Sequence, residues 1–211
     1  MNEILWRPTP ERAAATQIMA LAREQGFDGP GAVDRLWRWS VDHPEAFWRR
    51  VWELGGVKAS RPADAVLRRG DRMPGAEWFP GARLNFAENL LRRDDATPAL
   101  IFGGEDGERR ELSWSDLRAE VQALAAAFAA DGVGVGDRVA GYLPNIPETV
   151  IAMLATASLG AIWSSASPDF GVDGVLDRFG QIEPKVLVTV DGYRYAGKRI
   201  DIRDKVAQVA G

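Results

Sequence analysis

The sequence predicts an α/β protein in which helices connect the strands of a mainly parallel sheet, preceded by a helical segment. After residue 97, helical and strand patterns alternate along the chain, whereas the earlier part has short helical repeats and is rich in Trp, Arg and Pro. Apolar residues make up 46% of the 211 residues and charged residues 27%, which is ordinary globular composition. Parallel strands need crossover connections, and helices commonly supply them. We therefore expect a helical, Trp-rich cap over residues 1–97 and a first α/β portion over residues 98–211.

The N-terminal part predicts two helices and one short helical turn. Residues 11–24 have apolar side chains on one helical face, and Gly26 ends this helix. A second helix begins at Pro44, which suits the first turn of a helix, and it ends at Gly55. Residues 78–91 read as a turn followed by a short helix.

The second part predicts a hairpin followed by alternating helices and strands. Residues 99–102 and 110–112 flank a Gly-rich turn, which is typical of a hairpin. Ser113, with Asp116 three residues later, predicts the start of a helix that ends at Asp131 and Gly132. The remaining elements are expected as strands over 138–143, 161–166 and 185–190 and as helices over 147–158 and 172–182.

Charge and composition exclude several classes of function. With 26 basic and 30 acidic residues the net charge is -4, which gives no electrostatic argument for nucleic-acid or membrane binding. The absence of Cys excludes disulfides, thiolate metal sites and Cys nucleophiles. The single histidine, His43, excludes a His-rich metal site and is expected to be a capping or surface residue. We find no transmembrane run and no signal-peptide pattern, so a cytoplasmic protein is expected.

The glycines at residues 132–136 resemble a phosphate-binding loop but stand in the wrong context. A dinucleotide-binding loop follows a strand and opens a helix, whereas these glycines follow a helix and precede a strand. They are therefore predicted to form a helix end and a turn.

Candidate ligand-binding residues follow the carboxyl ends of predicted strands. Asp169, Phe170 and Gly171 follow the strand at 161–166, at the edge where ligands bind in open parallel sheets. They are site candidates on position alone, and a plain turn is the alternative. The loop at 143–148 leaves another strand at the same edge, and its residues also suit a turn before a helix. Glu105 and Asp106 stand on the hairpin tip, where solvated charge is the normal use.

A basic cluster follows the last predicted strand. Its members are Arg194, Lys198, Arg199 and Arg203. Arginine forks match phosphate oxygens, and each charge-assisted hydrogen bond contributes about 1.5–3 kcal/mol. A solvated run of charge is the alternative.

Several sequence blocks together resemble the N-terminal part of the adenylate-forming acyl-CoA synthetases. They span nearly the whole chain and comprise residues 5–8, 36–41, 47–48, 78–91, 143–148, 160–171 and 175–187. The blocks at 78–91 and at Ser-Pro-Asp-Phe-Gly, residues 167–171, are similar to the acetoacetyl branch of that family in particular.

The resemblance implies a two-step ligase that uses ATP, Mg²⁺ and CoA. Acetoacetate and ATP would form an acyl-adenylate, and the CoA thiol would then displace AMP. The 211 residues contain no Ser/Thr/Gly-rich phosphate loop, so the resemblance implies the first half of the sheet and roughly the first third of an enzyme. The ATP and Mg²⁺ sites would lie largely beyond residue 211. We assign no catalytic residue and expect this chain alone to be inactive.

The resemblance also implies a CoA site. In related acetyl-CoA synthetases, two basic residues after the strand equivalent to 186–190 contact the phosphates of CoA's nucleotide, and Arg194 and Lys198 occupy the similar positions. Lys198 replaces an arginine of the family, which changes the available hydrogen-bond geometry. Asp169, Phe170 and Gly171 stand where the family has a Gly-Gly-Phe loop, a departure that weakens the transfer of backbone contacts to them.

Two further interpretations stay open. The chain could belong to a ligase for another short-chain acyl or 3-oxo acid, or it could be a non-catalytic module that binds CoA or a nucleotide or interacts with another protein. An incomplete parallel sheet also predicts an exposed strand edge, and hence self-association or a missing companion segment.

Overall fold

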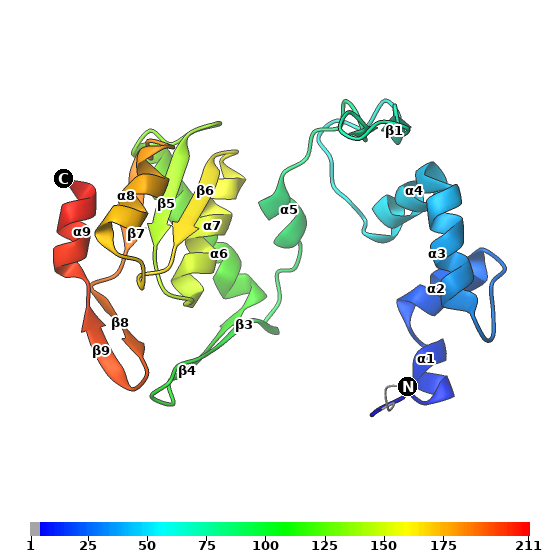
Figure 1. Cartoon of the computed structure of the whole chain (residues 1–211), viewed down its shortest axis with the longest axis horizontal. Coiled ribbons are helices and arrows are strands. Elements are labelled where there is room, and N and C mark those ends of the chain that lie inside the picture. Colours follow the sequence, from blue (N-terminus) through cyan, green and yellow to red (C-terminus); the bar gives the residue numbers. More distant parts are fainter. Residues whose placement is uncertain (1–4) are drawn as a thin grey trace. The chain divides into compact units, whose positions relative to one another are not determined.

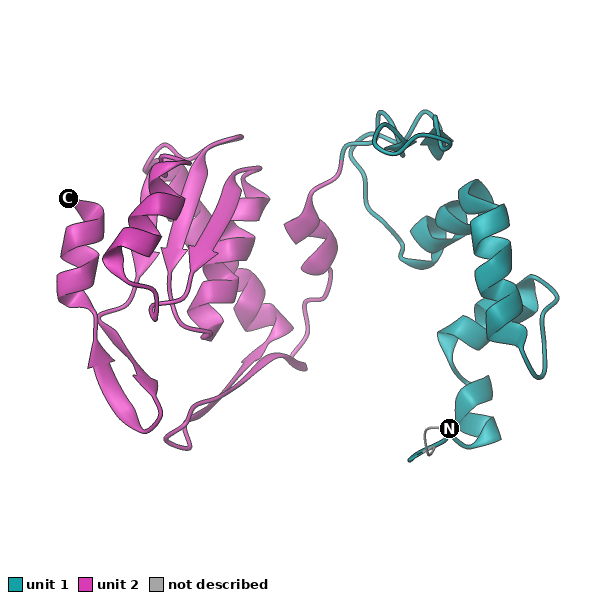
Figure 2. Cartoon of the chain, in the orientation of Figure 1, with its two compact units in different colours: residues 1–83 teal, residues 84–211 magenta. Residues whose placement is uncertain are grey.

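A computed structural model describes residues 5–211, and the chain divides into two compact units. The first unit comprises residues 1–83 and the second residues 84–211 (Figure 2). The expected cap over 1–97 and α/β portion over 98–211 stay a prediction about domains. None of the helices described within residues 5–211 is long and apolar enough to cross a membrane.

The first unit is helical, and N-cap or proline residues mark the starts of several of its helices. They are α1 (Pro10–Ala14), α2 (Gln17–Glu24), α3 (Ala32–Asp42) and α4 (Pro44–Leu54). The prediction of one helix over 11–24 is wrong in its continuity, because Thr16 leaves the helical conformation and its hydroxyl accepts a hydrogen bond from the backbone N–H of Met19. The helix expected from Pro44 is confirmed as α4. The helix α3 was not predicted.

Aromatic side chains and one ion pair connect the elements of this unit. Leu21, Ala22, Ala32 and Leu36 form a small core between α2 and α3. Two rings of α4 contact rings of a later segment. The ring centroids of Trp48 and Trp78 lie 5.7 Å apart, and those of Trp52 and Phe79 lie 4.5 Å apart. Trp78 belongs to a two-stranded ribbon of β1 (Leu67–Arg68) and β2 (Glu77–Trp78). Arg50 of α4 binds both carboxylate oxygens of Glu24 on α2, each at 2.8 Å.

The second unit begins with α5 (Phe86–Leu90) and the predicted hairpin. Strands β3 (Pro98–Gly103) and β4 (Arg109–Ser113) pair in antiparallel fashion, which confirms the hairpin. The long helix α6 (Trp114–Ala130) follows, and the hydroxyl of Ser113 and the carboxylate of Asp116 form the expected capping box. Gly132 and Gly136 have φ angles of 82° and 83°, and they serve the helix end and the turn that the sequence predicts.

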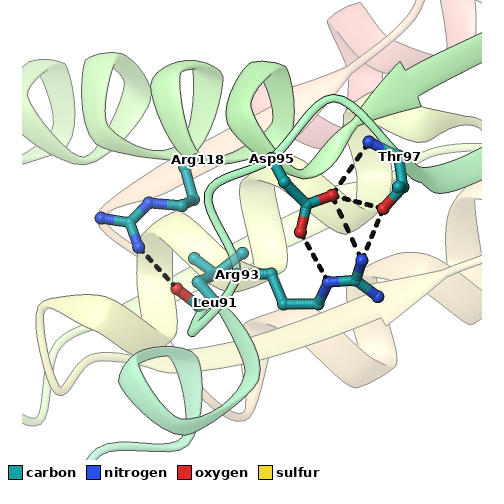
Figure 3. A network of polar contacts seen from close by, with 5 residues as sticks. All are labelled: Leu91, Arg93, Asp95, Thr97 and Arg118. Atoms are coloured by element: carbon teal, nitrogen blue, oxygen red, sulfur yellow. Dashed lines mark hydrogen bonds and ion pairs between the residues drawn. The ribbon is translucent and has the colours of Figure 1, made fainter.

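Hydrogen bonds order the segment between α5 and β3. Asp95 accepts from the guanidinium of Arg93 at 2.9 Å and from the backbone N–H of Thr97 at 2.9 Å, and the hydroxyl of Thr97 also donates to it (Figure 3). Arg118 of α6 donates to the carbonyl of Leu91 at 2.9 Å (Figure 3). This segment is therefore fixed to α6 before the hairpin begins.

The parallel sheet is confirmed, and helices cover both of its faces. The strands β5 (Arg138–Tyr142), β6 (Ile162–Ala166) and β7 (Val186–Thr189) are all parallel, in the order β6-β5-β7. The connecting helices are α7 (Pro147–Ser158) and α8 (Val172–Gly180). Helices α6 and α7 lie on one face, and α8 lies on the other beside the C-terminal helix α9 (Arg203–Ala210) (Figure 1).

Alternation along the central strand β5 divides the core between these two faces. Val139 packs into a cluster with side chains of α6 and α7, such as Val121 and Leu154. Ala140 and Tyr142 point into a second cluster, which includes Val175 of α8 and the fully buried Ile202 before α9. Burial on both faces agrees with the uncharged run Val139–Tyr142 of β5.

A second hairpin follows β7 and was not predicted. It consists of β8 (Gly192–Tyr195) and β9 (Lys198–Asp201), which pair in antiparallel fashion with Arg194 opposite Arg199. In Figure 1 this hairpin and the β3–β4 hairpin extend to the same side of the sheet, with their tips beside one another.

A candidate ligand-binding cavity at the carboxyl end of the sheet

A cavity of about 480 Å³ lies at the carboxyl ends of the parallel strands, within the second unit. Its floor comes from the segments after β5, β6 and β7, and its walls come from the two hairpins. The segments that line it are residues 102–106, 108, 144–146, 167–169, 190 and 192–195. Open α/β sheets bind ligands at this edge, and the size is typical of a small-molecule site.

Asp169 lies in the cavity wall and is held by two hydroxyl groups. The hydroxyl of Tyr193 donates to Oδ1 at 2.5 Å, and that of Ser167 donates to Oδ2 at 3.0 Å. These hydrogen bonds lower the pKa of Asp169. Burial and the same bond to Asp169 raise the pKa of Tyr193 to about 12. At neutral pH the pair therefore presents a carboxylate and a neutral phenol in a fixed orientation.

Tyr142 of β5 binds the backbone of the loop that carries Asp169. Its side chain is fully buried, and its hydroxyl donates to the carbonyl oxygens of Phe170 at 2.7 Å and Pro168 at 3.2 Å. Thr189 of β7 donates to the carbonyl of Tyr142 at 3.1 Å. The loop that carries Asp169 is thus tied to the central strand of the sheet.

Phe170 and Gly171, two other candidates from the sequence, have different surroundings. The Phe170 ring is 41% exposed and lies 4.6 Å from the guanidinium carbon of Arg178. Gly171 precedes the first turn of α8. Neither residue lines the cavity, whereas Asp169 does.

The tips of the two hairpins are joined by charged groups. Arg194 Nε lies 2.8 Å from the Asp106 carboxylate, and both residues line the cavity. The Glu105 carboxylate accepts hydrogen bonds from the backbone N–H groups of Ala196 at 3.2 Å and Gly197 at 3.0 Å. Glu105 and Asp106 are exposed, as expected for solvated charge, and the structure adds that both bind the other hairpin.

The basic cluster separates into one cavity residue and three surface residues. Arg194 lines the cavity. Lys198 is exposed at the start of β9 and is not part of the cavity wall. Arg199 pairs with Asp191 at 3.5 Å, and Arg203 pairs with Asp201 at 2.5 Å. Position along the sequence alone could not make this distinction.

The loop after β5 also contributes to the cavity. Pro144, Asn145 and Ile146 line it, whereas Glu148 turns away to form an ion pair with Arg110 of β4 at 2.7 Å. Sequence reasoning missed Tyr193, which lines the cavity, and Tyr142, which supports the loop of Asp169. Their only signal in the sequence was position. Tyr142 lies at the carboxyl end of the strand expected over 138–143, and Tyr193 follows the strand expected over 185–190.

The described residues contain no cluster arranged for metal binding. Within residues 5–211, no three His, Cys, Asp or Glu side chains gather in a way that could hold an ion. His43 is exposed, as expected, and its ring centroid lies 6.2 Å from that of Trp39.

Known proteins resemble the chain over nearly its whole length. It is 55% identical over 209 residues to an acetoacetyl-coenzyme A synthetase of Rhizobium meliloti, covering 98% of this chain and 32% of that protein. A malonamoyl-CoA synthetase of Penicillium aethiopicum is 39% identical over 219 residues, covering 99% of this chain and 30% of that protein. The solved structure of an acetoacetyl-CoA synthetase from Streptomyces lividans matches with a TM-score of 0.87 and 49% identity, over 99% of this chain and 33% of the other. The chain thus spans about a third of the length of these relatives.

Two family models match consecutive parts of the sequence. The model described as acetyl-coenzyme A synthetase N-terminus matches residues 33–90, and the model described as AMP-binding enzyme matches residues 86–210. The second match covers more than half of the 211 residues and includes every residue of the cavity wall. This agrees with the resemblance inferred from the sequence blocks, and the chain belongs to the AMP-binding enzyme family.

Proposed function

We propose that the chain is the N-terminal segment of an ATP-dependent acetoacetate–CoA ligase. The observation that carries the proposal is 55% identity, over 98% of this chain, to a protein named acetoacetyl-coenzyme A synthetase. In the proposed reaction a carboxylate oxygen of acetoacetate attacks the α-phosphorus of ATP and pyrophosphate leaves. The CoA thiolate then attacks the acyl carbon of the adenylate, and AMP leaves with the bonding electrons. ATP and Mg²⁺ would be bound by other parts of the enzyme.

Within the ligase, the residues at the carboxyl end of the sheet would bind the nucleotide part of CoA. The cavity at the carboxyl end of the sheet has room for a small-molecule moiety, and Arg194 supplies a guanidinium on its wall. Guanidinium groups bind phosphate oxygens through charge-assisted hydrogen bonds. Lys198 follows the same hairpin turn and could reach a phosphate from the exposed side. Asp169, fixed by Tyr193, would accept a hydrogen bond from the ligand.

Exchange of labelled pyrophosphate into ATP tests the reaction. An enzyme that contains this chain should catalyse exchange when acetoacetate is added, and the 211-residue chain alone should not. Exchange with acetate or propionate in preference to acetoacetate would refute the substrate assignment. The similarity to a malonamoyl-CoA synthetase makes malonamate a second acid to compare, and a preference for it would favour the alternative of another 3-oxo acid.

Calorimetry with CoA tests the binding role in the 211-residue chain. Arg194→Ala should weaken CoA binding by about tenfold, the loss of one charge-assisted hydrogen bond, and Lys198→Ala should have a smaller effect. Arg203→Ala is the matched control because it removes the same charge from an exposed pair outside the cavity wall. Equal effects of the Arg194 and Arg203 variants would contradict the proposed site. CoA binding without pyrophosphate exchange in the longer enzyme would favour a non-catalytic binding module.

We also propose that the isolated chain self-associates. The outer strand β6 begins with Ile162, whose side chain is 53% exposed. Exposed apolar strand edges tend to pair with other chains. Light scattering should therefore detect species larger than 23.1 kDa, and a monomer across the concentrations tested would refute this proposal.

A further inference from the structure

The tips of the β3–β4 and β8–β9 hairpins form a closed contact on the cavity wall. Each oxygen of the Glu105 carboxylate accepts one backbone N–H, from Ala196 at 3.2 Å and from Gly197 at 3.0 Å. The neighbouring Asp106 binds Arg194 at 2.8 Å. We call this set of contacts the hairpin clasp; its two tips lie beside one another in Figure 1.

The β8–β9 turn has the geometry of an anion-binding site. Ala196 and Gly197 have φ angles of 50° and 74°, and their adjacent N–H groups converge on one carboxylate. With the guanidinium of Arg194 on the preceding strand, the hairpin offers two backbone donors and one cation. Backbone N–H groups in such turns and arginine guanidinium groups also bind phosphate. The donors that hold the two carboxylates of the tip are therefore of the kinds that also bind phosphate oxygens.

The carboxylates that occupy this site stand on an exposed hairpin tip. The ion pair of the clasp is exposed, with 54% of the Arg194 side chain and 36% of the Asp106 side chain accessible to solvent. Exposed ion pairs are weak because water and salt screen them. The acidic tip is also flanked by Gly103, Gly104 and Gly107, and glycine backbones adapt readily to a new conformation.

We propose that the β8–β9 turn and Arg194 form an anion-binding site that the acidic tip of the β3–β4 hairpin occupies until a phosphate-bearing ligand displaces it. The tip acts as an internal competitor: closed, it occupies the donors of the site, and open, it leaves them free for the phosphate. Identification of the ligand as CoA rests on the proposed function, whereas the competition itself requires only a phosphate. Removing one carboxylate of the clasp should therefore strengthen phosphate binding.

Titration of the ¹⁵N-labelled 211-residue chain tests this competition. Inorganic phosphate and CoA are the two probes, and the amide signals of Ala196 and Gly197 report directly on the site. Glu105→Gln and Asp106→Asn each remove one negative charge from the clasp. Glu111→Gln is the matched control, because it removes the same charge from the same hairpin at an exposed residue that pairs with Arg109 on its own strand. Thermal unfolding of each variant verifies that it folds.

The clasp variants should be half-saturated at a phosphate concentration about three- to tenfold lower than the wild-type chain, because a larger fraction of the molecules is open. Glu111→Gln should stay within about twofold of wild type, and Arg194→Ala should abolish the gain. Phosphate binding by the clasp variants that is no tighter than that of Glu111→Gln would overturn the proposal, as would an absence of binding in every variant.

The CoA arm separates this proposal from the proposed function. A phosphate response that strengthens in the clasp variants, without CoA binding in any variant, would support the competition and overturn the assignment of CoA. CoA binding that depends on Arg194 but is equal in wild type, Glu105→Gln and Asp106→Asn would support the CoA site and overturn the competition.

Discussion

The buried hydroxyl of Tyr142 provides a sharp test of how the candidate site is supported. Tyr142→Phe removes only the oxygen and keeps the ring that packs in the second core cluster. The lost hydroxyl donates to the carbonyl of Phe170 at 2.7 Å and lies 3.2 Å from that of Pro168. We expect this variant to destabilise the loop that carries Asp169 and, through it, the second unit.

The magnitude follows from the burial of the hydroxyl. A net hydrogen bond contributes about 0.5–1.5 kcal/mol, and a buried acceptor that loses its donor adds a desolvation cost, so the expected loss is about 1–3 kcal/mol. For a urea m-value of about 2 kcal/mol per molar, a loss of 2 kcal/mol lowers the unfolding midpoint by about 1 M. The 0% exposure of Tyr142 excludes water as a replacement partner without rearrangement.

Urea unfolding followed by circular dichroism measures this difference. Tyr195→Phe is the matched control, because it removes the same oxygen from a side chain that is 59% exposed. Its midpoint should stay close to that of the wild-type chain. Equal midpoints for the Tyr142 and Tyr195 variants would refute the conclusion that the buried hydroxyl holds the loop.

Three further predictions concern the same fold. A hydrogen bond from Arg93 lowers the pKa of Asp95 from its usual 3.8 to about 2. The stabilisation of the folded state by this carboxylate is therefore fully present above about pH 4 and is lost as the pH falls through about 2. Asp95→Asn should flatten the pH dependence of the urea midpoint in this range. A methyl group on Gly141 would come within 2.5 Å of the Trp163 ring, so Gly141→Ala should cost about 1–3 kcal/mol and Trp163→Leu should relieve that cost in urea unfolding. The Asn85 side chain caps α5 and donates a hydrogen bond to the last turn of α7 at 2.8 Å. Asn85→Asp should lose only the bond to α7, whereas Asn85→Ala should lose both contacts. Each lost contact should lower the unfolding free energy by about 1 kcal/mol in urea unfolding.

Each of these predictions has an outcome that contradicts it. An Asp95→Asn midpoint as sensitive to acid as wild type would show that other carboxylates control the acid response. A Gly141→Ala variant as stable as the wild-type chain would mean that the Trp163 ring can move aside without cost. Equal stability of the two Asn85 variants would remove the distinction between its cap and its bond to α7.

Local sequence patterns predicted most of the second unit because its elements satisfy local rules. The helix expected over residues 147–158 has these bounds as α7, and its first residue is a proline with a preset φ. The capping box at Ser113 and the positive φ at Gly132 determine one helix start and one helix end. Helical patterns between successive strand patterns indicated crossover connections, and the sheet is parallel as expected.

Elements that depend on distant partners were harder to predict. The β8–β9 hairpin has four-residue strands, and only Tyr193 and Ile200 of it pack against the second core cluster. Its signal of apolar alternation is therefore too short to detect. Thr16 was expected inside a single helix over residues 11–24, although its hydroxyl is a good N-cap that separates two helices. The first error arises because the segment is too short to show a pattern, and the second because Thr16 fits two local patterns, a helix interior and an N-cap.

The candidate site combines residues placed by local patterns with residues placed by distant partners, which is why only part of it could be predicted. Position at the carboxyl end of a strand identified Asp169, because topology alone brings strand ends to one edge. Glu105 instead binds backbone N–H groups 91 and 92 residues away, and a backbone donor has no residue type by which a sequence could reveal it. An acidic hairpin tip and a basic hairpin each read as solvated charge when taken alone. Their contact joins two ordinary surface patterns, and the proposed competition between a carboxylate and a phosphate rests on that contact.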